Sequence, residues 1–201
     1  MKFEDFKNCH AGQSILVCGL GESINQLSSI DLLGKITSIG VNDIGRKFQP
    51  TYLLNVNNRS QYKGDRFQFI EGTKARFLFT QNPKEQGNAQ VPIVTFEIAR
   101  EVGGVAIIGK ALPHFRNSPY MAVALAGYMG ARRIGVIGVD FTDNHFWIKD
   151  GPHRLMNELD RINTQYGKLA QYLSGQGTEV FNLSPISRLT SLSKLSLAQW
   201  Q

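Results

Sequence analysis

The segment Ile15–Ile24, ILVCGLGESI, carries the pattern that decides the fold. Its first four residues form an unbroken apolar run, which is typical of a strand buried on both faces of a parallel sheet. Gly19 and Gly21 follow, and glycines at this point allow a tight turn in which backbone N–H groups approach an anion at the start of a helix. A strand, a glycine turn and a helix in this order predict the first unit of an α/β fold.

Apolar, β-branched runs recur between turn signals along the rest of the chain. Several are unbroken, so we expect a single doubly wound, mostly parallel sheet flanked by helices, which is a Rossmann-like α/β fold. A small-residue helix is predicted over 119–130, and an amphipathic helix over 154–175 that stops at two glycines. The further predicted strands are 36–41, 51–56, 75–79, 105–108, 134–137 and 179–182.

One domain is expected over 1–201, because 201 residues with 42% hydrophobic content suffice for one core. The polar loops 82–91 and 141–152 are candidates for mobility. The tail 184–201 alternates serine and leucine, and we expect it to pack on the domain or to form a short helix. No internal repeat is visible.

Composition narrows the function classes. The N-terminus is too polar for a secretory signal and no apolar stretch is long enough to span a bilayer, so a cytoplasmic protein without a membrane span is predicted. Cys9 and Cys18 fit neither a zinc site nor a disulfide framework. The net charge of +6 favours an acidic ligand such as a nucleotide or nucleotide-sugar, but the scattered lysines and arginines do not indicate nucleic-acid binding. The sequence leaves a homo-oligomer open.

Candidate ligand-binding residues follow the predicted strands, because the carboxyl ends of the strands form the binding edge of such a sheet. The first turn offers backbone amides to a phosphate, although it lacks the third glycine of the dinucleotide fingerprint and also suits a plain tight turn. The second strand ends in an amide and a carboxylate, which suit a ribose or a base or simply end the strand. The predicted nucleotide-binding residues are Gly19, Leu20, Gly21, Ser23, Asn42 and Asp43.

A second group of candidates lies later in the chain. Ser118 precedes Pro119, a pair that predicts a helix cap and a first helical residue, with the serine hydroxyl at the binding edge. Asp140 follows a predicted strand, where it can orient backbone amides or bind a cation. His153 is expected near a helix N-terminus, where the helix dipole disfavours the protonated imidazole and so suits a neutral base, although a lone loop histidine is also an ordinary surface residue.

In order along the chain, these segments resemble the bacterial sialyltransferases of glycosyltransferase family 42 and a related group of pterin-diphosphokinase-like proteins. No single segment is specific, but together they span most of the chain. The resemblance rests on 18–24, Val41-Asn42, 118–130, 137–141, His153 and 180–185.

The resemblance implies a glycosyltransferase that moves a sugar from a CMP-sugar to a hydroxyl acceptor. Its first turn and Asn42 would hold the nucleotide, Ser118 would touch the donor, and His153 would take the proton from the acceptor hydroxyl. That chemistry needs no metal or other cofactor. The family's phosphate-binding tyrosines are absent from loop 141–152, where His145 or Lys149 is a candidate substitute. The predicted substrate residues are Asn57, Ser118, Asp140, His145 and Lys149.

Two alternatives stay open at the level of sequence. One is an ATP- and Mg²⁺-dependent diphosphokinase, for which Asp140, Asp143 and Asp150 would supply oxygen ligands. The other is a nucleotide- or sugar-binding protein without activity, because Leu20 and Glu22 depart from the family's asparagine and proline in the first turn.

Overall fold

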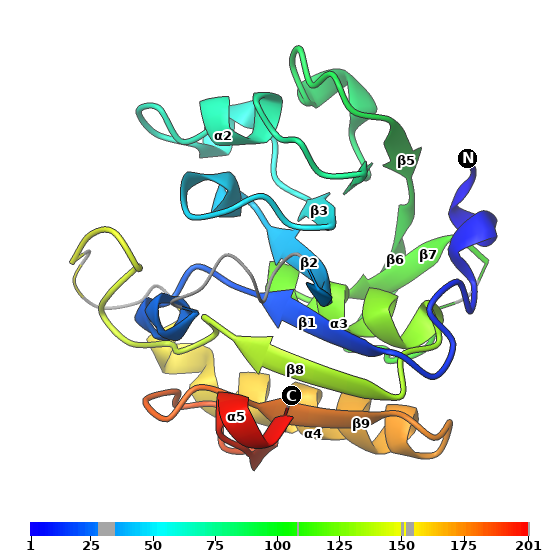
Figure 1. The fold of residues 1–201 in the computed structure, drawn as a ribbon, viewed down its shortest axis with the longest axis vertical. Coiled ribbons are helices and arrows are strands. Elements are labelled where there is room, and N and C mark those ends of the chain that lie inside the picture. The colour runs from blue at the N-terminus through cyan, green and yellow to red at the C-terminus, as the bar shows by residue number, and fades with distance from the viewer. Residues whose placement is uncertain (28–34, 108, 150, 152–154, 201) are drawn as a thin grey trace.

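The computed structural model describes residues 1–27, 35–107, 109–149, 151 and 155–200. Its main element is an eight-stranded sheet in which every neighbouring pair of strands is parallel (Figure 1). The strands lie in the order β10 (Ser193–Lys194), β9 (Glu179–Asn182), β8 (Arg133–Ile137), β1 (Ser14–Cys18), β2 (Thr37–Val41), β3 (Tyr52–Asn55), β4 (Phe77–Thr80) and β5 (Ile93–Thr95).

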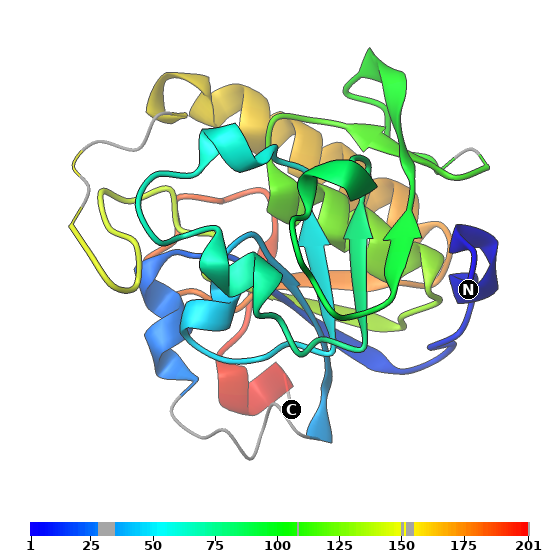
Figure 2. The ribbon, with the colours of Figure 1, turned by 90° about the horizontal axis from the view of Figure 1, so that it is seen from above.

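Helices cover both faces of this sheet (Figure 2). The long helices α3 (Ser118–Tyr128) and α4 (Leu159–Ser174) lie on one face, and α2 (Gln68–Glu71) and α5 (Leu197–Trp200) lie on the other. A separate two-stranded parallel sheet consists of β6 (Glu97–Val102) and β7 (Ala111–His114). The 3₁₀ turns are η1 (Phe3–Phe6), η2 (Glu22–Gln26), η3 (Ile44–Arg46), η4 (Arg59–Gln61), η5 (Pro83–Glu85) and η6 (Met156–Glu158).

Two apolar clusters, one on each face, form the core. Successive side chains of a strand point to opposite faces, so Ile15 and Val17 of β1 join the cluster beside α3 while Leu16 and Cys18 join the other. All four are fully buried. The residues of β1 are therefore apolar because both faces of the strand are buried, as predicted. The predicted Rossmann-like, doubly wound fold is confirmed.

Most of the predicted strands are confirmed, as β1, β2, β3, β4, β8 and β9. The predicted strand at 105–108 is wrong: residues 105–107 form no strand, although Val105 and Ile107 pack against the core from an irregular segment. A short apolar run reports burial and does not by itself report conformation. The sequence also missed β5, which has three residues, and the two strands of the small sheet, β6, which is mostly exposed, and β7.

Both predicted helices exist with shifted starts. The helix predicted from residue 154 begins as the 3₁₀ turn η6 and becomes α-helical only at Leu159; residue 154 itself lies outside the described residues. The tail forms β10 and α5, and the Trp200 side chain is 1% exposed, packed where Gly135 of β8 leaves room. Within the described ranges, no helix has the length and apolar character needed to cross a membrane.

Candidate functional site

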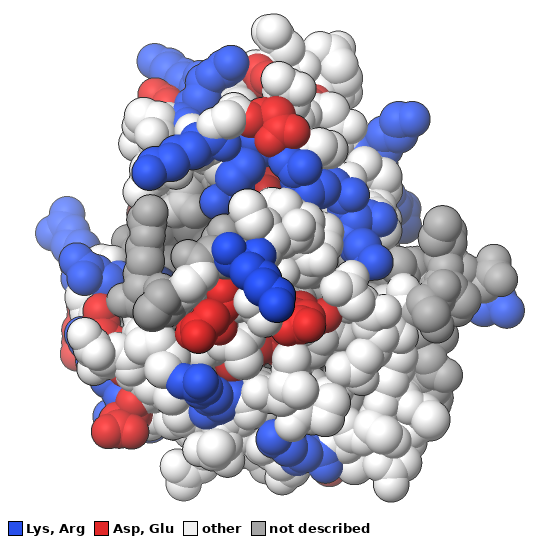
Figure 3. All heavy atoms as spheres, turned by 90° about the vertical axis from the view of Figure 1, so that its left-hand side faces the viewer, with Lys and Arg blue, Asp and Glu red and all other residues white. Residues whose placement is uncertain are grey.

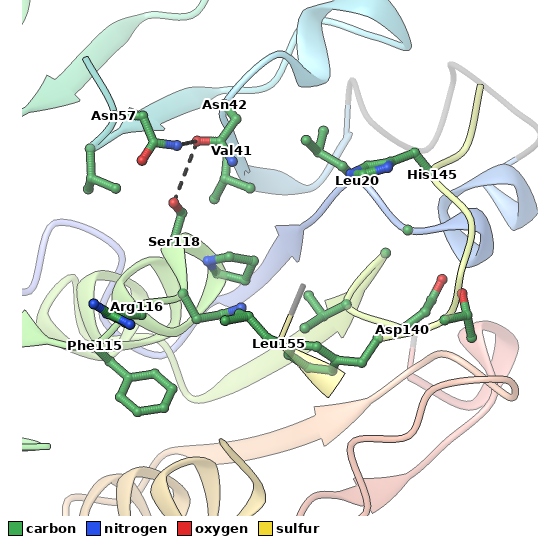
Figure 4. A pocket seen from close by; sticks show the side chains of 18 of the residues that line it. Leu20, Val41, Asn42, Asn57, Phe115, Arg116, Ser118, Asp140, His145 and Leu155 are labelled. Atoms are coloured by element: carbon green, nitrogen blue, oxygen red, sulfur yellow. Dashed lines mark hydrogen bonds between the residues drawn. The ribbon is translucent and has the colours of Figure 1, made fainter. Parts of the chain in front are cut away.

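A cavity of about 510 Å³ opens at the carboxyl ends of β1, β2 and β8 (Figure 4). We call it the first cavity. Its wall is built from the turn after β1, the end of β2, the start of α3 and the segment 138–145. Pockets for small ligands in proteins usually have volumes of about 300–1,000 Å³ and, in open α/β sheets, lie at this edge.

A second cavity of about 840 Å³ lies beside the first. Its charged lining residues are four cations and two carboxylates, namely Arg46, Lys63, Arg66, Arg116, Asp65 and Asp143. Figure 3, which faces this side of the molecule, shows lysines and arginines over the upper half of that face. The two cavities are adjacent and share seven lining residues, namely Asn42, Asn57, Gln61, Arg116, Thr142, His145 and Leu155.

The turn after β1 is closed by the end of β8. The amide of Gly19 donates to the carbonyl of Ile137 at 2.8 Å, and the amide of Gly21 donates to the carbonyl of Gly138 at 2.7 Å. A side chain at Gly19 would collide with the Gly138 backbone, whose carbonyl carbon lies 2.9 Å from the ideal Cβ position. These glycines therefore allow two strand ends to approach, and their amides are already bonded within the protein.

Ser23 and Asp140 lock this closure. The Ser23 amide and hydroxyl donate to the two Asp140 carboxylate oxygens at 2.7 and 2.6 Å, and the same hydroxyl accepts from the Gly138 amide at 2.9 Å. Both side chains are 2% exposed. Ser23 does not line either cavity, whereas Leu20, Gly21 and Asp140 line the first.

The carboxylates do not assemble into a cation site in the part of the chain that is described. No group of three or more His, Cys, Asp or Glu side chains is close enough there to hold a metal ion. Asp140 is bonded to Ser23, Asp143 lines the second cavity, and Asp150 lies outside the described residues.

The two residues that end β2 point in different directions. Asn42 adopts a left-handed backbone with a φ of 53°, which asparagine tolerates better than most residues, and it lines both cavities. Asp43 is fully buried and accepts two hydrogen bonds from the Arg66 guanidinium, at 2.9 and 2.7 Å. The structure therefore brings Asn42 to the site but not Asp43, because an ion pair holds the carboxylate on the other side.

The start of α3 corrects the predicted cap. Asn117, not Ser118, is the N-cap: its Oδ1 accepts from the Tyr120 amide at 3.1 Å and from the Tyr166 hydroxyl at 2.6 Å. Asparagine caps a helix as well as serine does. Ser118 is thus the first helical residue, and its hydroxyl donates to Asn42 Oδ1 at 3.5 Å in the wall of the first cavity (Figure 4).

Side chains that the sequence left in loops support Asn42 from behind. Asn57 Nδ2 lies 3.2 Å and the Tyr62 hydroxyl 3.1 Å from Asn42 Oδ1. Tyr62 also lies 2.6 Å from Asn55 Oδ1, and Asn55 donates to Gln86 Oε1 at 2.8 Å. Asn55 and Gln86 are fully buried. Sequence reasoning identified Asn57 as a substrate residue but missed Tyr62 and Gln86, since nothing in their local sequence marks them.

The segment after β8 brings His145 to the wall between the cavities. Its amide donates to the Ile148 carbonyl at 3.0 Å, and the neighbouring Phe146 amide donates to the Leu20 carbonyl at 2.9 Å, which ties this segment to the first turn. Lys149 is exposed and lines neither cavity. His153 lies outside the described residues.

The sequence also missed wall residues with plain polar side chains. Arg116, Gln61 and Thr142 line both cavities, and Asn144 lines the first. The Arg116 guanidinium is largely exposed and approaches Glu158 only to 4.0 Å. Nothing in the sequence distinguished these residues except that they follow strands. The loops at this edge of the sheet contain many other polar residues.

No protein-family model matches the chain, and no curated protein matches it. Solved structures do. The MAf glycosyltransferase of Magnetospirillum magneticum AMB-1 superposes with a TM-score of 0.64 and 13% identity, over 99% of this chain and 38% of its own. This chain therefore spans well under half the length of that protein.

The sialyltransferase CST-II, in complex with a trisaccharide acceptor and CMP, superposes with a TM-score of 0.54 and 11% identity, over 94% of this chain and 88% of its own. A tyrosine-to-phenylalanine variant of it with CMP gives a TM-score of 0.51 and 12% identity. The predicted likeness to bacterial sialyltransferases is confirmed for the fold. At these identities the likeness concerns the fold alone.

Proposed function

We propose that this chain binds a nucleotide-activated sugar in the first cavity and transfers the sugar to a hydroxyl of an acceptor in the second. The observation that carries the proposal is the pair of adjacent cavities at the carboxyl edge of the sheet, which share Asn42, Arg116 and His145 among their lining residues. A transferase holds two substrates beside each other, and two cavities that share lining residues place two ligands side by side.

The fold neighbours support this assignment by their chemistry. CST-II holds CMP and a trisaccharide acceptor. In this chain, Asn42 and Ser118 lie next to each other in the wall of the first cavity, where they offer an amide and a hydroxyl to a nucleotide. The cations of the second cavity favour an acceptor that carries negative charge.

In the proposed reaction, the acceptor oxygen forms a bond to the anomeric carbon of the sugar. The bond from that carbon to the phosphate oxygen breaks, and its electron pair leaves with the nucleotide. A base removes the proton from the acceptor hydroxyl. We propose His153 as that base, on the resemblance described above.

The first experiment is a thermal-shift screen with CMP, CDP, UDP, GDP, ATP and NAD, each with and without Mg²⁺, because a ligand that binds only the folded state raises its melting temperature. Stabilisation by CMP or CDP without metal supports the proposal. Stabilisation by ATP only with Mg²⁺ would replace it with the diphosphokinase, and no response to any nucleotide would overturn it.

Replacement of His153 separates a transferase from a binding protein. His153→Ala is expected to lower turnover by about 100-fold or more while nucleotide affinity stays within about twofold of wild type, because a general base acts on the acceptor. Turnover is measured as nucleotide release from a nucleotide-sugar. His114→Ala, which lies on neither cavity, is the control. Full turnover in His153→Ala would remove this residue from the mechanism.

A further inference from the structure

We propose that Asn42 serves its ligand as a hydrogen-bond donor only, because Tyr62 and Asn57 fix the direction of its amide. The ligand group that faces Asn42 must then be an acceptor, such as a base carbonyl or an unprotonated ring nitrogen. This inference rests on the proposed function and specifies which part of the nucleotide meets the end of β2. Its basis is a chain of hydrogen bonds whose directions follow from one another.

The chain starts at backbone groups, whose roles are not reversible. The backbone amide of Asn57 donates to Asn55 Oδ1 at 3.2 Å, and Asn55 Nδ2 donates to the backbone carbonyl of Asn57 at 3.1 Å. A backbone N–H only donates and a carbonyl only accepts. The side-chain amide of Asn55 therefore has one orientation, with its oxygen toward Tyr62.

Tyr62 has one proton and two oxygens near it. Its hydroxyl lies 2.6 Å from Asn55 Oδ1 and 3.1 Å from Asn42 Oδ1. Both distances are within hydrogen-bond range, and both amide oxygens can only accept, so the hydroxyl is the donor that lies between them. Burial raises the pKa of Tyr62, so this proton is present throughout the physiological range. The Tyr62 hydroxyl is therefore one donor that faces Asn42 Oδ1.

Asn57 supplies a second donor. Its Nδ2 donates to Asn42 Oδ1 at 3.2 Å. Asn42 Oδ1 thus accepts from Asn57, and the Ser118 hydroxyl at 3.5 Å faces the same oxygen (Figure 4).

Only the Asn42 nitrogen remains for a ligand. Among the described residues, none accepts a hydrogen bond from Asn42 Nδ2, and this atom is not one of the buried polar atoms without a partner. Since Asn42 lines both cavities, its N–H groups are open to them. An acceptor placed there completes the chain. A second donor placed there would meet a donor and leave both groups unbonded.

The test is Asn42→Asp, which keeps the oxygen that Asn57 and Ser118 approach and replaces the free NH₂ with a second oxygen. The probes are cytidine and uridine, which are uncharged and so exclude repulsion by the new carboxylate, together with CMP. We expect the variant to fold with an unchanged melting temperature and to bind cytidine or uridine about tenfold more weakly than wild type, or worse.

Asn8→Asp is the matched control. Asn8 is also a left-handed asparagine, with a φ of 58°, and it lies on neither cavity of the site. Its replacement should leave every affinity unchanged. A ribose hydroxyl, unlike a carbonyl, can reverse its hydrogen bond and donate to a carboxylate. Full affinity in Asn42→Asp would therefore overturn the inference while leaving the proposed function in place.

Tyr62 is a positioning residue in this account, and a double-mutant cycle tests that role. Tyr62→Phe should weaken nucleoside binding about two- to fivefold in the wild-type background and have no further effect in Asn42→Ala, because it acts through Asn42. An equal loss in both backgrounds would assign Tyr62 a merely structural role and overturn the directional chain. If wild type bound none of the three probes and no nucleotide of the thermal-shift screen stabilised it, the proposed function would fall, and this inference with it.

Discussion

The turns after β1 and β2 lie side by side at the same edge of the sheet, but they use their polar groups in opposite ways. The first has the glycine pattern expected of a phosphate site, yet the amides of Gly19, Gly21 and Ser23 bond to β8 and to the segment that follows it. The second has no glycine motif, yet Asn42 lines both cavities. In this chain, the glycine motif serves the closure of the sheet, and an asparagine presents a polar group to both cavities.

The cause of the difference is the neighbouring strand. β8 pairs with β1, so the turns that follow these two strands must pass within van der Waals distance, which only glycine at residues 19 and 138 permits. Asn42 follows β2 instead, and its side chain accepts from Asn57, which follows β3, and from Tyr62. At the turn after β1, close backbone packing therefore engages polar groups in hydrogen bonds within the protein. At the turn after β2, side chains make the contacts, and a polar group remains on the cavity wall.

Gly19→Ala tests whether close backbone contacts hold the turn after β1 against the end of β8. The new methyl group would meet the Gly138 backbone, which cannot move aside as a flexible side chain can. We expect a loss of about 3 kcal/mol or more in the free energy of unfolding, measured by urea denaturation. Gly104→Ala is the control, since a Cβ there meets nothing within 4 Å. Unchanged stability in Gly19→Ala would show that the first turn is looser than its contacts indicate.

Replacement of Ser23 and of Ser118 by alanine tests the different roles of the two turns, with smaller expected changes in stability. Ser23→Ala removes a buried hydroxyl that both donates and accepts, and should cost about 2 kcal/mol of unfolding free energy without changing nucleotide affinity. Ser118→Ala removes only a long contact, at 3.5 Å, so stability should change by about 0.5 kcal/mol or less while affinity falls about two- to fivefold. Urea denaturation and calorimetry measure the two quantities. The reverse pattern would contradict the assignment of the two turns.

The smallest expected effect concerns the proton of Tyr62. Burial raises the pKa of this hydroxyl above the value of about 10 that it has in an unfolded chain. As the pH rises above about 10, the unfolded state loses this proton first, so the stability it contributes is complete below that pH and declines above it. Tyr62→Phe should make the decline of unfolding free energy shallower by up to about 1.4 kcal/mol per pH unit. An unchanged slope would mean that Tyr62 titrates as in the unfolded chain.

The strands were predictable where burial on both faces leaves an unbroken apolar run, as in β1 and β2. The failures have specific causes. Val105 and Ile107 are apolar because they pack on the core from a segment without regular structure. β6 has no continuous apolar run, because it lies outside the main sheet and is mostly exposed. The spacing of apolar residues shows which face of a helix or strand is buried, and in these segments buried and exposed residues follow no regular spacing.

The candidate site was predictable in position but not in detail. The rule that ligands meet the carboxyl ends of the strands located Leu20, Asn42, Asn57, Ser118 and His145, all of which line the first cavity. It does not distinguish a side chain that faces the cavity from one that faces inward, such as Asp43 against Arg66. That choice depends on partners distant in sequence.

The sequence by itself determined the layered α/β fold and the edge of the sheet that holds the cavities, because local apolar runs and turn residues encode both. Only the tertiary structure decided which polar groups remain open there. Ser23 bonds to Asp140 across 117 positions of the chain, and the Ser118 hydroxyl meets Asn42 across 76. A hydrogen-bonding group has few bonds to make, and a single sequence does not show whether a distant residue has already taken them.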